Sequence, residues 1–218
     1  MRKVKKQSGF TLVEIAIVLV IIGLLLAGVL KGQELIESSR VKSMAKDLNG
    51  FSTMYTSYLD RYHGVPGDDL TATTHLERGW GATAFTAGDN TGLIGAGGAA
   101  LIFPPAALSE NLQAYQALRY AGFLSGNGSS ILAPTSATGG AIGFTNKVFG
   151  FGAVNVVCFN NLNGKQAAAL DLLLDDGVFN TGSVRSDTVI GTGAMTATAT
   201  ATVYSEAVTS GVILCKTL

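Results

Sequence analysis

MRKVKKQSG (residues 1–9), followed directly by FTLVEIAIVLVIIGLLLAGVL (residues 10–30), is the stretch that sets the fold class of this 218-residue chain. Glu14 is the single ionisable side chain among the 21 residues of the apolar run. As an α-helix rising about 1.5 Å per residue, the run spans a bilayer hydrocarbon core of roughly 30 Å. Basic flanks stay on the cytoplasmic side, so we expect the N-terminus inside and the remainder outside.

The small residues at the end of the leader distinguish this segment from an ordinary secretory signal. Ser8 and Gly9 precede the apolar run, whereas an ordinary signal places its cleavage site after that run and loses it. The order of basic leader, Gly, Phe, Thr, Leu, Val, Glu and apolar helix closely resembles the class III signal of type IV pilins and of the pseudopilins of type II secretion. The resemblance implies cleavage between Gly9 and Phe10 by prepilin peptidase, N-methylation of Phe10 and retention of the whole helix.

Glu14 is a candidate assembly residue. It would be the fifth residue of the mature chain, where the family carries its glutamate. Independently of the family, a carboxylate in a lipid-facing run costs about 2 to 3 kcal/mol, which favours a functional role. The expected partner is the α-amino group of Phe10 on a neighbouring subunit, because the pair would neutralise two charges in an apolar filament core. The alternative is a glutamate near the lipid headgroups with no function.

Beyond residue 30 the apolar pattern changes to a single helical stripe. No proline interrupts residues 10–63, and Gly64 with Val65-Pro66-Gly67 supplies the stop, which predicts one helix about 80 Å long. The stripe indicates packing of the second half of the helix against a sheet, and its members recur at steps of three and four: Val41, Met44, Leu48, Phe51, Tyr55, Tyr58 and Tyr62.

Three glycines interrupt the membrane half of this helix, namely Gly23, Gly28 and Gly32. Two interpretations stay open. The glycines either let neighbouring helices approach closely or mark points where the helix unwinds on assembly. The best-known type IV pilins carry a proline in this region, and Lys31 stands at the corresponding position here.

The remaining residues, 64–218, are rich in Gly, Ala, Thr and Asn, which is typical of an exported β-rich domain. We expect an irregular loop over 79–100, a helix over 111–124, one or two strands over 141–159, a Thr-faced strand over 196–204 and a last strand over 211–216. The expected fold class is α+β, a long N-terminal helix packed on an antiparallel sheet, and the resemblance implies that this fold is pilin-like. The expected division is leader 1–9, helix 10–63 with 10–30 in the membrane, and head 64–218.

Cys158 and Cys215 are the only two cysteines. In an oxidising periplasm they are expected to form one disulfide that ties the last strand to the body. Such a bridge resembles the C-terminal loop that many type IV pilins display on the fibre surface. Free thiols or a metal site are disfavoured, because His63 and His75 lack ligand-type spacing with a cysteine.

Several functional classes lack support in the sequence. The leader holds four of the 15 basic residues, which leaves 11 basic against 15 acidic residues and no basic patch for general nucleic-acid binding. No phosphate loop, nucleophile elbow or histidine cluster is present, so no enzyme activity and no cofactor are expected. Residues 88–92 and 175–177 carry calcium-type oxygens without the spacing of a calcium loop, and turn chemistry explains them.

Two further segments, 62–69 and 174–185, resemble parts of pilin-like proteins. The family implies a subunit that waits in the inner membrane with its head in the periplasm and enters a surface filament for adhesion, motility or DNA uptake. Its partners would be other copies or other pilins, prepilin peptidase and the inner-membrane assembly machinery. The alternatives are a type II secretion pseudopilin and a membrane-anchored periplasmic binding module that does not polymerise.

Overall fold

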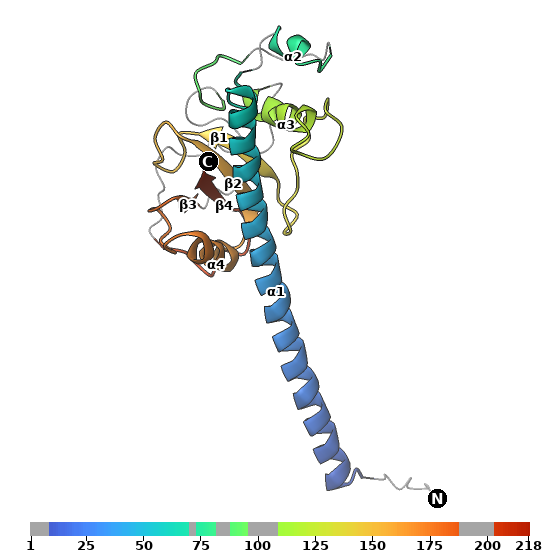
Figure 1. Ribbon diagram of the computed structural model, residues 1–218. Helices are drawn as coiled ribbons and strands as arrows, with labels where there is room; N and C mark the ends of the chain where they lie inside the picture. The colour runs from blue at the N-terminus through green and yellow to red at the C-terminus, as the bar shows by residue number, and fades with distance from the viewer. Residues whose placement is uncertain (1–8, 70–72, 82–87, 96–108, 188–202) are drawn as a thin grey trace, which may run out of the picture. The chain divides into compact units, whose positions relative to one another are not determined.

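The computed structural model describes residues 9–69, 73–81, 88–95, 109–187 and 203–218 (Figure 1). The chain divides into two compact units, Met1–Ser39 and Arg40–Leu218. Helix α1 (Leu12–Tyr62) runs through both of them, and each unit is described by itself.

The first unit is a bare apolar helix. An 18-residue window of α1 has a mean hydropathy of 3.0, and none of it is buried. It is the one helix in the described part of the chain that is long and apolar enough to cross a bilayer. No part of this unit that the structure describes, residues 9–39, shields these apolar side chains from the surroundings.

The second unit is an α+β head built on one sheet. After α1 come α2 (Thr74–Glu77), α3 (Glu110–Tyr120), β1 (Ile142–Asn146), β2 (Asn155–Leu162), α4 (Gly164–Leu174), β3 (Val184–Asp187) and β4 (Val212–Thr217). The strands lie in the order β1-β2-β4-β3, and every neighbouring pair is antiparallel. The expected fold class is confirmed.

The core lies where α1 packs on this sheet. Six members of the predicted stripe, Val41, Met44, Leu48, Phe51, Tyr55 and Tyr58, are buried, and Tyr62 packs against them partly buried. The Phe51 ring meets Phe144 of β1 edge to face, with centroids 5.7 Å apart. The step of three and four residues thus set which face of the helix the head covers.

Helix α3 anchors the edge strand of the sheet. Asn111 Nδ2 donates to the Phe144 carbonyl at 2.6 Å, and the Tyr115 hydroxyl donates to the Ile142 carbonyl. The helix expected at 111–124 ends at Tyr120, because Gly122 takes a positive φ of 79° and reverses the chain.

The other sequence expectations meet the structure in part. The segment 141–159 forms two strands, β1 and β2, and β4 matches the expected last strand within one residue. The described parts of 79–100 carry no helix or strand, while the strand expected at 196–204 falls mainly outside the described residues. Helices α2 and α4 and strand β3 were not predicted.

Candidate processing and assembly site

The expected cleavage junction lies just before the first turn of α1. Gly9 and Phe10 have no helical structure, and Phe10 is 84% exposed. An exposed, non-helical peptide is accessible to a protease, so the geometry of the junction is compatible with processing.

Glu14 caps the helix that it opens. Its Oε2 accepts from the Thr11 backbone N–H at 2.8 Å and from the Thr11 hydroxyl at 2.7 Å, and the Glu14 N–H donates back to Thr11 Oγ1 at 3.2 Å. This reciprocal pattern is a capping box, in which a threonine and a glutamate three residues later satisfy the free N–H groups of the first turn. The sequence signal for it, Thr11-x-x-Glu14, was present and was missed.

The capping box gives Glu14 a local partner in the single chain. It also fixes the carboxylate at the end of the helix next to Phe10, close to where cleavage would create a new amino terminus. A negative charge is favoured there, because the N-terminus of a helix carries a partial positive charge. The local role and a role between subunits are compatible.

Cys158 and Cys215 form the predicted disulfide. The two residues are register partners on β2 and β4, and neither side chain is exposed. The bridge ties the last strand to the body, as expected. Both cysteines lie on the two central strands of the sheet.

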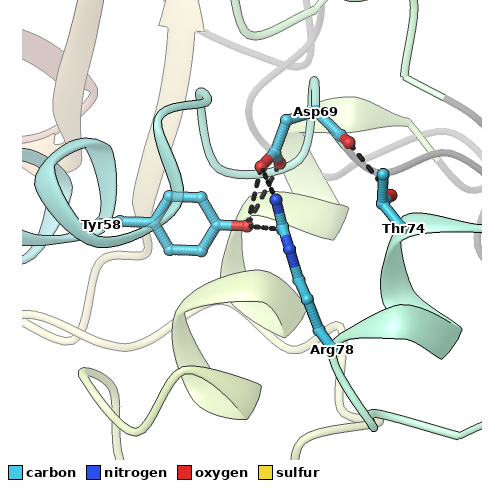
Figure 2. A network of polar contacts seen from close by, with 4 residues as sticks. All are labelled: Tyr58, Asp69, Thr74 and Arg78. Atoms are coloured by element: carbon cyan, nitrogen blue, oxygen red, sulfur yellow. Dashed lines mark hydrogen bonds and ion pairs between the residues drawn. The ribbon is translucent and has the colours of Figure 1, made fainter.

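A buried polar network closes the end of α1 (Figure 2). The Tyr58 hydroxyl donates to Asp69 at 3.1 Å, and Arg78 donates to Asp69 Oδ2 and to the Tyr58 oxygen, both at 2.7 Å. Thr74 Oγ1 donates to the Asp69 carbonyl at 3.2 Å. Sequence reasoning missed this cluster, because its members come from three segments that only the fold brings together.

The shifts in the pKa of Asp69 and Tyr58 fit a structural role for this network. Burial raises the pKa of Asp69, while the hydrogen bonds from Arg78 and Tyr58 oppose that rise. Burial, with the Asp69 charge beside it, also raises the pKa of Tyr58, so the phenol stays protonated and donates. The network ties the turn after α1 to the residue that follows α2.

Two groups of carboxylates converge within metal-ligand distance in the described part of the head. Asp68, Asp89 and Glu110 form one, and Asp171, Asp175 and Asp176 form the other, with their oxygens within 4.8 Å of one another.

Backbone N–H groups already occupy many of these oxygens. Asp68 accepts from Thr91 and Gly92, and Glu110 accepts from Asp89 and Gly95. The oxygens of the first group therefore hold the loop 88–95 in place, as turn chemistry predicts.

The leader and the apolar run also match a known family. The family described as the prokaryotic N-terminal methylation motif matches residues 4–30. The chain carries a class III signal. This signal is typical of type IV pilins and pseudopilins, which are generally non-enzymatic structural proteins. No curated protein and no solved structure matches the chain.

The class III signal also bears on the cellular location and processing of the chain. A signal of this type with an exposed apolar helix is typical of pilin-like proteins that are anchored in the inner membrane. It also implies processing by prepilin peptidase and handling by pilin assembly machinery in general.

Proposed function

We propose that this chain is a type IV pilin-like structural subunit that prepilin peptidase cleaves between Gly9 and Phe10. The new amino terminus at Phe10 is N-methylated, and the mature subunit polymerises into a surface filament. The observation that carries this proposal is the class III signal on an apolar helix with no buried residue in its most apolar window. The working division is leader 1–9, helix 10–63 and head 64–218.

Assembly is the step in which the exposed helix gains protein neighbours. In the membrane the helix is covered by lipid, and in a filament it is covered by the helices of other subunits. Both surroundings are apolar, so the transfer conserves most of the hydrophobic burial. Polar groups then decide the register, because an unpaired charge in an apolar interior is costly.

Glu14 is the proposed register-setting group. Its charge would pair with the α-amino group of Phe10 on a neighbouring subunit, and removing one partner of a buried pair costs about 3 to 5 kcal/mol. Glu14→Val is expected to insert into the membrane and to be cleaved normally, but to be depleted from filaments. Glu14→Asp keeps the charge with a shorter reach, so an intermediate loss is expected.

The test measures filament-associated against membrane-associated subunit in a strain that lacks the native gene. Filaments are sheared from the cells and analysed by mass spectrometry, which also reports whether the subunit begins at N-methylated Phe10. Wild-type protein that still carries residues 1–9 would refute the processing step. Glu14→Val filaments equal to wild type in amount and in resistance to shear would refute the role of Glu14.

Two control variants separate assembly from local effects. Thr11→Val removes the hydroxyl of the capping box but keeps Glu14 and its bond to the Thr11 backbone N–H. If the defect of Glu14→Val came from the lost cap, Thr11→Val would reproduce much of it, whereas the proposal predicts near-normal filaments. Asp60→Val removes an exposed acid from the same helix and is also expected to assemble.

The second candidate is a type II secretion pseudopilin, since pseudopilins carry the same signal. Deleting the gene separates the two: loss of surface filaments supports the pilin, and loss of protein secretion with filaments intact supports the pseudopilin. Absence of any polymer containing this chain would leave the membrane-anchored binding module.

A further inference from the structure

Helix α4 packs Ala167 and Leu170 into the core and exposes Lys165, but it also buries an aspartate and exposes two leucines. Its one acidic residue, Asp171, is fully buried against the head, where its Oδ2 accepts from the Tyr204 hydroxyl at 2.7 Å. Leu172 and Leu173 face outward and are 71% and 53% exposed. Ala169, one turn earlier, is exposed as well, and so is Val178 just after the helix.

This arrangement gives α4 an apolar outer face, defined here as Ala169, Leu172, Leu173 and Val178. A helix at a protein surface normally turns its apolar stripe inward and its charges outward. Adjoining exposed apolar side chains on one element mark an interaction surface more often than single scattered ones do. The outer face of α4 is therefore a candidate interaction surface.

Two carboxylates border this face at the C-terminal end of α4. Asp175 accepts from the Val184 N–H at 3.1 Å, and Asp176 accepts from the Val178 N–H at 2.8 Å, so turn geometry holds both in place. The C-terminus of a helix carries a partial negative charge, which disfavours acids there. Asp176 also accepts from the Thr181 hydroxyl at 2.6 Å and lies near the charge of Arg185. Neither carboxylate forms an ion pair with a described lysine or arginine, so a cation from outside would add stabilisation.

The same chain carries a complementary surface on α1. Lys42 and Lys46 are exposed and lie one turn apart, so their like charges repel. Neither lysine forms an ion pair within the described ranges. Lysine side chains can cover apolar groups with their methylene stems while the ammonium groups reach a carboxylate. The pair thus offers apolar surface for leucines and positive charge for the two aspartates.

We infer that in the filament the outer face of α4 on one subunit packs against Lys42 and Lys46 on α1 of a neighbouring copy. Leu172 and Leu173 contact the lysine stems, while Asp175 and Asp176 pair with the ammonium groups. Because two different patches of one chain meet, the contact is heterologous, and heterologous contacts that do not close generate helical filaments. The inference rests on the proposed filament function and names the head contact within it.

A cross-linking experiment tests the identity of the partner. Two full-length chains with different tags are co-expressed, one carrying Leu172→Cys and the other Lys46→Cys, so that any link between the tags joins two copies. Among the described residues both native cysteines are bonded to each other, so the introduced thiols are the reactive ones. A disulfide-linked heterodimer is expected in sheared filaments. Its absence there would overturn the inference.

A matched substitution pair tests the importance of the contact. Leu172→Asp with Leu173→Asp places charge on the outer face of α4, and the filament fraction is expected to fall at least about tenfold. Leu132→Asp changes an equally exposed leucine, at 74%, outside α4 and is expected to leave the filament fraction unchanged. Fluorescence of Trp80, the only tryptophan, checks that each head stays folded.

The outcomes separate this inference from the proposed function. Wild-type filaments with a folded but fully assembling Leu172→Asp, Leu173→Asp variant would overturn the α4 contact and leave the filament function standing. Absence of wild-type filaments would overturn both. Loss of filaments in the Leu132→Asp control to the same degree would also count against a specific contact at α4.

Discussion

The two parts of α1 use apolar residues in different ways. In the first unit the apolar side chains surround the helix and stay exposed, so Leu24 is 70% exposed. In the second unit they form one stripe that the head buries, and Leu48 is fully buried. A helix that is apolar all round has its partners outside the chain, whereas a one-sided stripe has them within it. The same helix therefore carries an exposed apolar surface in its first part and a folding core in its second.

The largest effect in the head should come from the disulfide. Replacing both cysteines, Cys158→Ala with Cys215→Ala, is expected to lower the free energy of unfolding of the head by about 4 kcal/mol, because the bridge closes a long loop. Denaturation of full-length protein in detergent, followed through Trp80 fluorescence, measures it. Trp80 stacks on Tyr120 at 5.5 Å and so reports the second unit.

The same double substitution should not affect the behaviour of the first unit. Leader cleavage and membrane insertion are expected to be unchanged, since both depend on residues 1–30. Impaired cleavage in the disulfide variant would show that processing at the start of the first unit depends on the folded head.

Two leucines on α1 test most directly whether apolar side chains stabilise the head only in the second unit. Leu48→Ala is expected to cost about 3 kcal/mol of head stability, because it removes a fully buried side chain and leaves a cavity. Leu24→Ala removes the same atoms from an exposed position and should leave the Trp80 unfolding curve in place. Equal destabilisation by both substitutions would contradict the assignment of Leu24 to an external surface.

A smaller, pH-dependent effect should arise at Asp171. Burial, with Asp175 and Asp176 nearby, raises the pKa of Asp171 to about 6, although the Tyr204 hydroxyl opposes the rise. A raised carboxyl pKa means that the folded head holds the proton more tightly than the unfolded chain. The stabilisation from protonated Asp171 is therefore complete below about pH 4 and is lost as the pH rises through about 6, by roughly 3 kcal/mol.

Melting temperatures of wild type and Asp171→Asn between pH 4 and pH 7 measure this contribution. The asparagine variant lacks the titrating group, so its melting temperature should change less over this range. The helicity of the first unit should stay constant in both proteins. If the melting temperatures of wild type and Asp171→Asn changed equally with pH, the titrating group would be a residue other than Asp171.

Local sequence patterns predicted the elements that depend on short-range physics. The stripe from Val41 to Tyr58, the turn after Tyr62 and the last strand were all visible, because periodicity and turn residues act within a few positions of the chain. The capping boxes were equally local, at Thr11 with Glu14 and at Asn163 with Gln166. The Asn163–Gln166 capping box marks the start of α4 in the sequence, although α4 was not predicted.

Local patterns could not predict hydrogen bonds between residues that lie far apart in the sequence. Asn155 is one example, since its Nδ2 donates to the Tyr55 hydroxyl of α1 at 2.9 Å across 100 residues of sequence. The triad of Tyr58, Asp69 and Arg78 is another. The stripe predicted that Tyr58 is buried, but Asp69 and Arg78 alone look like ordinary turn or surface residues, and only the packed head shows that the three are paired.

The sequence by itself determined the basic leader, the apolar helix, the position of Glu14 and the face of α1 that packs, because charge order and helical period are written along the chain. Only the tertiary structure decided that Cys158 and Cys215 are register partners on central strands, and that α4 buries its aspartate and exposes its leucines. The physical reason is that register and burial depend on which distant segments meet, and a linear pattern contains the period of an element but not its neighbours.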